Sequence, residues 1–317
     1  MKYRQITSSE RYAIAALRRH GLSLSAIARE LGRSASTIAR EVRRNRCNDL
    51  GYRASKADSR TRTRRSRSRR NERFSKRDWA VVERCLRRKW SPEQVAGRLR
   101  DDGVLFISYE TIYLYVWRDK EAGGDLWRYM RQATKRRRKR YGRYDSRGRL
   151  AGKRHISERP AEVESREVVG HWEIDTVKGD DQGRHTIVTV VERKTGFLQI
   201  GKLTRHTAAE TTQRTIELIE RDRERFATIT ADNGSEFHGY KDVEYATGVE
   251  FYFATPHHSW ERGTCENTNG LIRQYLPKRT SMAHITQTDC DAIAAELNSR
   301  PRKRLAWRTP EECYEAR

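Results

Sequence analysis

The order of its apolar segments is the feature that most limits how this 317-residue chain can fold. Three short runs rich in Ile, Val, Thr and aromatic residues lie at 172–177, 186–192 and 197–203, separated by turn-forming residues. The segments that follow alternate: a helix at 207–225, a strand at 227–231, a helix at 240–246, a strand at 249–253 and a long helix from near Gly263. An antiparallel meander leading into parallel strands covered by helices is an α/β mixed sheet.

Three acidic residues occupy unusual places in this framework. Asp175 lies in the middle of the first strand, Asp232 at the carboxyl end of the fourth, and Glu266 on the helix that starts near Gly263. The first and fourth strands are neighbours in this topology, so we expect the two aspartates to converge, with Glu266 aimed at the same edge. Three close carboxylates without counter-charges repel one another, so they need a divalent metal. Hard oxygen ligands favour Mg²⁺ or Mn²⁺.

Each of these residues also has a simpler explanation when it is taken singly. Asp175 can be a solvent-facing strand residue, and Asp232 can belong to an ordinary Asp-Asn-Gly turn. Glu266 can be a first-turn residue that complements the helix dipole. The metal-site interpretation therefore depends on all three occurring together, in the right order and topology.

The first 50 residues have a helix-turn-helix pattern. Thr7 and Glu10 are spaced as a capping box, and a helix that ends before Gly21 is followed by a short helix at 24–31. Ser34 caps a third helix, which in such units lies in the DNA major groove. A generic three-helix bundle with a solvated basic face is the alternative. The predicted DNA contacts on the third helix are Ser36, Thr37, Arg40, Arg43 and Arg44.

A looser copy of this pattern follows. A helix is expected at 78–89, a second capping box joins Ser91 to Gln94, and a further helix starts at Ser108. Two such units separated by a linker would read two stretches of one DNA site. On the last helix we predict Tyr109 and Thr111 as DNA contacts.

The segment between the two units is strongly basic. Residues 60–73 are nearly all Arg, Ser and Thr, a composition that cannot build a core. We expect this linker to contact phosphates or the minor groove, to fold on DNA and to confer steep salt dependence; a solvated spacer is the alternative. Its predicted DNA contacts are Arg62, Arg64, Arg65, Arg67, Arg69 and Arg70. A second basic run lies at 135–140.

The charge of the chain is concentrated in its first half. Residues 1–150 carry 42 Lys and Arg against 16 Asp and Glu, a net +26, whereas residues 151–317 carry 25 against 27, a net −2. A field of that size attracts a polyanion, most commonly nucleic acid. The five scattered cysteines, the polar N-terminus and the lack of an apolar run near 18 residues predict a cytoplasmic, nucleoid-associated protein without disulfides or a membrane partner.

Five stretches resemble bacterial insertion-sequence transposases of the IS-thirty family. They are GHWEIDTVKG at 170–179, WERGTCENTNGLIRQYLP at 260–277, LNSRPRKR at 297–304, IARELGRSASTIAREVRRN at 27–45 and WSPEQVAGRL at 90–99. Asp175, Asp232 and Glu266, with 33 residues between the last two, resemble the DDE triad of the retroviral-integrase-like transposases. Cys265 departs from the family pattern, in which a polar residue such as Asn is expected.

The resemblance implies a multidomain enzyme, with all-α helix-turn-helix modules followed by an α/β ribonuclease-H-like mixed-sheet catalytic domain. The expected parts are a first helix-turn-helix domain (1–50), a basic linker (51–75), a second helix-turn-helix domain (76–134), a basic connector (135–165), the DDE catalytic domain (166–280) and a helical tail (281–317).

The activity implied is that of a DDE transposase, which binds the terminal inverted repeats of its insertion sequence and catalyses metal-dependent DNA cleavage and strand transfer. Asp175, Asp232 and Glu266 would hold two Mg²⁺ ions, for which Mn²⁺ substitutes. Because two ends must be held together, a homodimer or higher oligomer on double-stranded DNA is expected. Further contacts to the DNA end or its phosphates would come from Arg262, Asn269, Arg273 and Lys278.

Two other functions fit parts of the pattern. A DNA-binding repressor with a decayed catalytic domain would explain the basic half, but it has no reason to keep three mutually repelling carboxylates. A metal nuclease or resolvase acting on branched DNA would explain the carboxylates, but not two sequence-reading units in tandem. Inverted repeats in the flanking DNA would distinguish a transposase from both.

Overall fold

The computed structural model describes residues 5–47, 51–68, 74–131, 152–179, 185–256 and 258–316. The chain divides into two compact units, residues 1–77 and 78–317. Arg69, Arg70 and the basic run at 135–140 lie outside the described residues. No helix in the parts that the structure describes is long and apolar enough to cross a membrane.

The first unit opens with the three expected helices, α1 (Ser8–Arg19), α2 (Leu24–Glu30) and α3 (Ala35–Asn45). The predicted capping box is present, since Thr7 Oγ1 accepts from the Glu10 amide and the Glu10 carboxylate accepts from the Thr7 amide. Ser23 and Ser34 cap the other two helices. One isoleucine from each helix is fully buried where the three meet: Ile14, Ile27 and Ile38.

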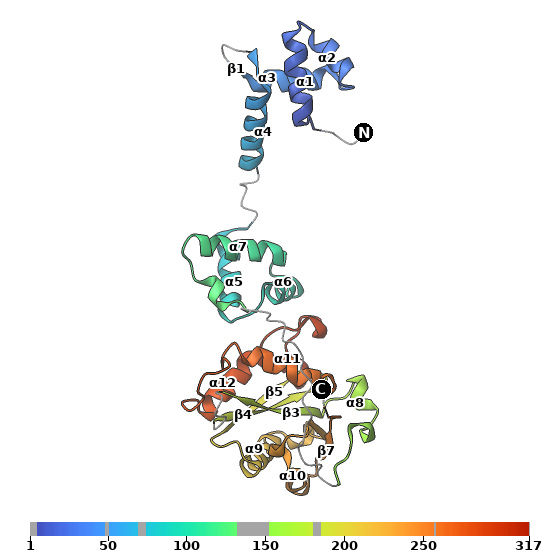
Figure 1. Cartoon of the computed structure of the whole chain (residues 1–317), viewed down its shortest axis with the longest axis vertical. Helices are drawn as coiled ribbons and strands as arrows, with labels where there is room; N and C mark the ends of the chain where they lie inside the picture. The colour runs from blue at the N-terminus through green and yellow to red at the C-terminus, as the bar shows by residue number, and fades with distance from the viewer. Residues whose placement is uncertain are drawn as a thin grey trace. The chain divides into compact units, whose positions relative to one another are not determined.

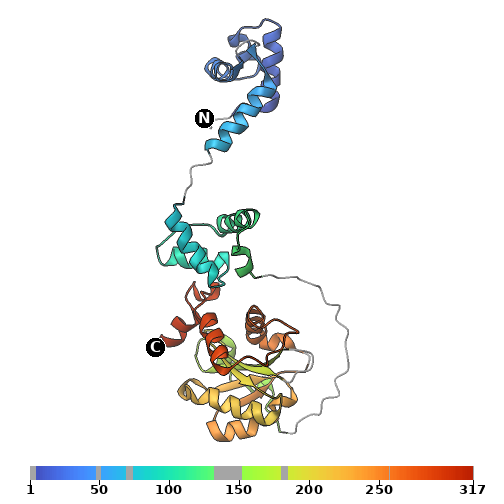
Figure 2. The same cartoon turned by 90° about the vertical axis from the view of Figure 1, so that its left-hand side faces the viewer.

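The segment after α3 differs from the expected basic linker. A short hairpin, β1 (Arg46–Cys47) and β2 (Gly51–Tyr52), leads into a regular helix, α4 (Ala54–Ser68). Ala54 and Ala57 pack into the core formed by α1–α3, so the start of the expected linker belongs to the first folded unit. The small alanines allow α4 to approach the other helices closely. The composition of residues 60–73, which are mostly Arg, Ser and Thr, gives no sign of this packing. Figure 2 shows α4 in light blue beside the three shorter helices.

The second unit begins with the helices of the second predicted module, α5 (Lys76–Arg87), α6 (Pro92–Asp101) and α7 (Tyr109–Glu121). The capping box of Ser91 with Gln94 and the Ser108 cap of α7 are both present. The helices expected from the sequence are therefore confirmed within a few residues.

The second module is attached to the carboxyl-terminal part of the chain. Gln94 Nε2 donates to the carbonyl of Pro301 at 2.9 Å, and Arg98 pairs with Glu312 at 2.8 Å. Gly97 lies against the ring of Trp307, where a Cβ atom would come within 2.1 Å of the indole. These contacts pack α6 against the tail in one folded unit, whereas the sequence predicted two separate regions.

A five-stranded sheet forms the centre of the second unit, in the order β5-β4-β3-β6-β7. The strands β3, β4 and β5 are an antiparallel meander, and β6 and β7 continue in parallel with β3. This arrangement confirms the mixed sheet and makes the first and fourth strands neighbours, as expected. The strand bounds are β3 (His171–Lys178), β4 (Thr186–Glu192), β5 (Leu198–Leu203), β6 (Thr228–Ala231) and β7 (Glu250–Phe253).

Helices cover both faces of this sheet (Figure 1). On one face α9 (Ala208–Glu220) and α10 (Tyr240–Thr247) enclose a core that includes the fully buried Trp172. On the other face lie α11 (Gly263–Ile272) and α12 (Gln287–Asn298). Because Cys290 and Leu297 of α12 are buried there, the expected boundary at 280 cuts through the core of this unit. Two short helices complete the unit, α8 (Glu162–Ser165) and α13 (Pro310–Glu315).

Candidate active site

Two aspartates converge at the carboxyl end of β6 because β3 and β6 run in parallel. Glu173 of β3 lies opposite Thr230 of β6, so Asp175 and Asp232, each two residues further on, reach the same level. Asp232 follows β6 directly, in a tight turn where its Oδ1 accepts from the Gly234 amide at 2.9 Å. The convergence predicted from the strand order is therefore present.

Arg262 lies between these two aspartates. Its Nη2 is 3.2 Å from Asp232 Oδ2 and its Nη1 is 3.5 Å from Asp175 Oδ1. Nη1 also donates to the carbonyl of Ile174 at 3.3 Å. The sequence predicted a phosphate contact at Arg262 but not this position, since nothing in the pattern shows that the loop before α11 folds over the two carboxylates.

The electrostatic environment of Asp175 is unusual for a carboxylate. Burial raises the pKa of Asp175 to about 6; Arg262 opposes this rise and the neighbouring Asp232 adds to it. A carboxylate held in this way is stabilised in its charged form by any cation that comes close. Perturbed carboxylates of this kind cluster at functional sites.

Glu266 lies in the first turn of α11 and shares a groove with Asp175. Its side chain is exposed, and the described residues contain no group of three His, Cys, Asp or Glu side chains arranged to hold a metal ion. The expected cluster of three carboxylates is thus present as two aspartates around a guanidinium, with Glu266 beside them. Repulsion explains the difference: Arg262 offsets only one of the two aspartate charges, and the remaining negative charge repels a third carboxylate.

A buried ion pair fixes the beginning of α11. Glu173 Oε1 is 2.6 Å from Arg193 Nη1, and both side chains are almost completely buried, with 0% and 4% exposed. The other oxygen, Oε2, accepts from the Cys265 amide at 2.8 Å. Glu173 therefore ties the strand that carries Asp175 to the helix turn that carries Glu266. Cys265 Sγ also contacts the Glu173 carbonyl at 3.3 Å, so the residue that departs from the family pattern packs inside.

Asn269 connects α11 to the sheet. Its Nδ2 donates to Asp175 Oδ2 at 2.8 Å, and its Oδ1 accepts from Thr189 of β4 at 3.1 Å. Asn269 was expected to contact DNA, but both of its amide atoms are directed to the protein. It orients Asp175. The two other predicted DNA contacts from this region, Arg273 and Lys278, line the same groove as Asp175 and Glu266.

Two further polar residues near the aspartates were missed by the sequence analysis. Glu236 accepts from Thr176 Oγ1 at 2.8 Å and lies 3.3 Å from His206 Nε2. Burial alone would raise the pKa of Glu236, but its own backbone amide, Thr176 and nearby positive charge outweigh burial and lower it. Lys153 donates to Asn233, which follows Asp232, at 2.9 Å. Glu236 falls within four residues of Asp232, so the spacing alone could have suggested it.

The predicted DNA contacts on α3 and α7 lie on helices as expected, whereas those of the expected linker that the structure describes lie on α4. Ser36, Arg40, Arg43 and Arg44 are exposed on α3, and Thr37 is half-buried. On α4, Arg62 and Arg65 are exposed and Arg64 is half-buried. On α7, Tyr109 is 45% exposed, while the Thr111 hydroxyl contacts Ser108 at 3.0 Å. Arg67 lies in α4.

Comparisons with known proteins agree with this arrangement. A family model described as a helix-turn-helix domain matches residues 2–45, and one described as an integrase core domain matches residues 165–259. A mixed sheet that presents paired aspartates, preceded by a DNA-binding module, defines an integrase-type polynucleotidyl transferase of the DDE class. Such an enzyme cleaves DNA strands and transfers them.

Three curated relatives identify the family. The transposase for insertion sequence element IS4351 of Bacteroides fragilis is 37% identical over 98% of this chain and 95% of its own length. The transposase for insertion sequence element IS1086 of Cupriavidus metallidurans is 40% identical over 98% of this chain and 94% of its own length. The transposase InsI for insertion sequence element IS30A of Escherichia coli K12 is 38% identical over 98% of this chain and 83% of its own length. The chain belongs to this family of insertion-sequence transposases.

Proposed function

We propose that Asp175, Asp232 and Glu266 are the catalytic triad and together hold two divalent ions, Mg²⁺ by preference, with Mn²⁺ able to substitute. The observation that carries this proposal is the shared guanidinium, because Asp175 and Asp232 already bind one cation between them. Their oxygens are the hard donors that Mg²⁺ and Mn²⁺ take. Glu266 lies in the same groove as Asp175, so its flexible side chain can add a third carboxylate.

Divalent ions at such a site act as Lewis acids and lower the pKa of bound water. The protein contributes position and charge. Asn269 holds Asp175 through a 2.8 Å hydrogen bond, and the Glu173–Arg193 pair holds the turn that carries Glu266. Arg262, Arg273 and Lys278 surround the groove with positive charge, which suits a phosphodiester.

The reaction proposed at this site has two steps. Water attacks the phosphodiester at the transposon end, the bond to the 3′ oxygen breaks, and the 3′ oxygen takes up a proton to leave a free 3′-OH. That hydroxyl then attacks a target phosphodiester, loses its proton and displaces the target's 3′ oxygen. Both steps are in-line substitutions at phosphorus, so the same positioned groups serve in each.

We also propose that the helical modules recognise the terminal inverted repeats of the element. The exposed arginines of α3 suit a helix lying in the major groove, and α7 is the second candidate reader. Because two ends have to be joined, the working form on DNA is a dimer or a larger oligomer of this chain.

One experiment tests the activity directly. The purified protein is incubated with a labelled duplex carrying the terminal inverted repeat found beside its gene, with Mg²⁺, Mn²⁺ or EDTA, and nicked and joined strands are resolved. We expect nicking at the end and some joined product with Mg²⁺ or Mn²⁺, and neither with EDTA. Tight binding without strand chemistry in either metal would instead support a repressor.

Replacing Arg262 should change the affinity for the metal itself. In Arg262→Gln the two aspartates lose their built-in cation, so we expect Mn²⁺ to bind the DNA-free protein at least about tenfold more tightly. Electron paramagnetic resonance of free Mn²⁺ measures this affinity without any turnover.

Arg273→Gln is the matched control for this measurement. It removes the same charge from the same groove, but the described hydrogen bond of Arg273 goes to the Leu276 carbonyl rather than to a carboxylate. Equal Mn²⁺ affinities in wild type and Arg262→Gln would contradict a metal site between the two aspartates.

A further inference from the structure

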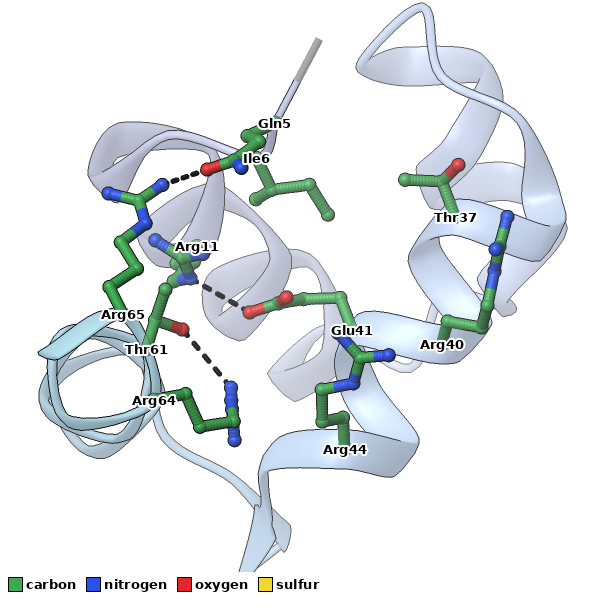
Figure 3. A pocket seen from close by; sticks show the side chains of 10 residues that line it. All are labelled: Gln5, Ile6, Arg11, Thr37, Arg40, Glu41, Arg44, Thr61, Arg64 and Arg65. Carbon is green, nitrogen blue, oxygen red and sulfur yellow. Dashed lines mark hydrogen bonds and ion pairs between the residues drawn. The ribbon is translucent and has the colours of Figure 1, made fainter. Parts of the chain in front are cut away.

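The first unit contains a strongly basic groove between α3 and α4, far in sequence from the catalytic residues. The groove has a free volume of about 290 Å³. Figure 3 shows Arg44 of α3 and Arg64 of α4 reaching toward the space between the two helices. Five arginines and a single glutamate are among its lining residues: Gln5, Ile6, Arg11, Thr37, Arg40, Glu41, Arg44, Thr61, Arg64 and Arg65.

The two walls of this groove are held at a fixed spacing. Arg11 of α1 pairs with Asp58 of α4 and with Glu41 of α3, each at 2.8 Å, so one guanidinium joins all three helices. Arg64 Nη2 donates to Asn45 Oδ1 at 2.7 Å at the end of α3. With Ala54 and Ala57 in the core as well, α4 is a structural wall rather than a tether.

The glutamate of the groove does not repel an anion as a free carboxylate would. Glu41 is only 10% exposed and accepts from Arg11, from Asn45 at 2.8 Å and from Tyr52 at 3.2 Å. Its charge is therefore partly offset inside the protein by Arg11, which also pairs with Asp58. Arg40, Arg44 and Arg65 are exposed at the rim, so an approaching ligand meets positive charge from both helices.

We infer that this groove between α3 and α4 binds the sugar–phosphate backbone of one strand of duplex DNA. The bound strand would lie beside the DNA major groove that α3 enters. Arginines on both walls can pair with phosphates of a strand lying between them, and the hydroxyls of Thr37 and Thr61 are additional donors to phosphate oxygens. The helix-turn-helix match ends at residue 45, so α4 is an addition to that module. The inference rests on the proposed DNA binding. In it, α4 is one wall of a rigid groove that holds a DNA strand, and not part of a basic linker.

The test neutralises single phosphates. A series of duplexes carries the terminal inverted repeat, and each duplex has a single methylphosphonate at a different position of one strand. The affinity of the full-length protein for each duplex is measured by titration. For wild type we expect roughly tenfold weaker binding at one or two adjacent positions of one strand, since a charge-assisted hydrogen bond is lost there. In Arg44→Gln and in Arg65→Gln, the penalty at those same positions should disappear.

Lys56→Gln is the matched control, because Lys56 is exposed on α4 and lines neither this groove nor the adjoining one. It should keep the full penalty at those positions. The two variants could lose the methylphosphonate penalty at separate positions or on different strands, or Arg65→Gln could keep every penalty. Either result would show that the groove does not hold one strand between α3 and α4. Failure of the proposed DNA binding, on which this inference rests, would look different, because wild type would then not bind the unmodified duplex at all.

Discussion

Strand cleavage should be lost in Asp232→Asn, while binding to the transposon end stays within about twofold of wild type. The amide keeps the shape of the side chain but removes one of the two charges that surround the shared cation. Asp232 would hold the divalent ion, and the loss of a preorganised group that supports charge stabilisation in the transition state costs at least roughly 10²–10³-fold in rate. Single-turnover cleavage of a labelled end measures this loss, and gel-shift titration of the same duplex measures binding.

Asp242→Asn provides the comparison. It makes the same chemical change at an exposed position on α10, outside the groove lined by Asp175 and Glu266. Cleavage by this variant should be unchanged. If Asp232→Asn loses binding together with cleavage, Asp232 maintains the fold of the edge of the sheet rather than the chemistry.

The second large effect is expected from breaking the buried pair beneath the active site. Arg193→Met leaves the Glu173 carboxylate inside the protein, with 0% of its side chain exposed and without its 2.6 Å partner. Stranding a buried charge costs about 3–5 kcal/mol of the free energy of unfolding. Urea unfolding of the metal-free protein, followed by circular dichroism, measures the change.

Two further variants separate the charge from the packing. In the double variant Glu173→Gln with Arg193→Met, no charge is left behind, and the Gln oxygen can still accept from the Cys265 amide, so most of the stability should return. Arg221→Met removes a pair with Asp291 that is about 40% exposed, where we expect less than about 1 kcal/mol. A loss in Arg193→Met no larger than in Arg221→Met would show that the buried pair does not hold α11.

The catalytic sheet was predictable because its information is local. Alternating apolar residues mark each strand, turn residues separate them, and the strand order alone makes β3 and β6 neighbours, which brings Asp175 to Asp232. The caps at Thr7, Ser91 and Ser108 were equally visible, because a cap and the amides it satisfies lie within one helical turn.

The parts that sequence analysis missed depend on contacts across long stretches of chain. Arg262 comes 87 residues after Asp175, and nothing near it in the sequence shows that it will lie against that carboxylate. The helix α4 is composed of residues typical of disorder, but two alanines and the Arg11–Asp58 pair attach it to the first unit. The packing of α12 on the sheet was missed for the same reason, since its partners lie in β5 and α11.

The contacts between α6 and the carboxyl-terminal tail impose an order on how the protein is completed during synthesis. Gln94 and Arg98 reach their partners, Pro301 and Glu312, only after the ribosome has added some two hundred further residues. Residues 1–77 form a separate unit, so they can fold while the rest is still being translated. A message cut short between codons 78 and 301 therefore yields a chain that keeps the unit of residues 1–77 but lacks the partners of Gln94 and Arg98.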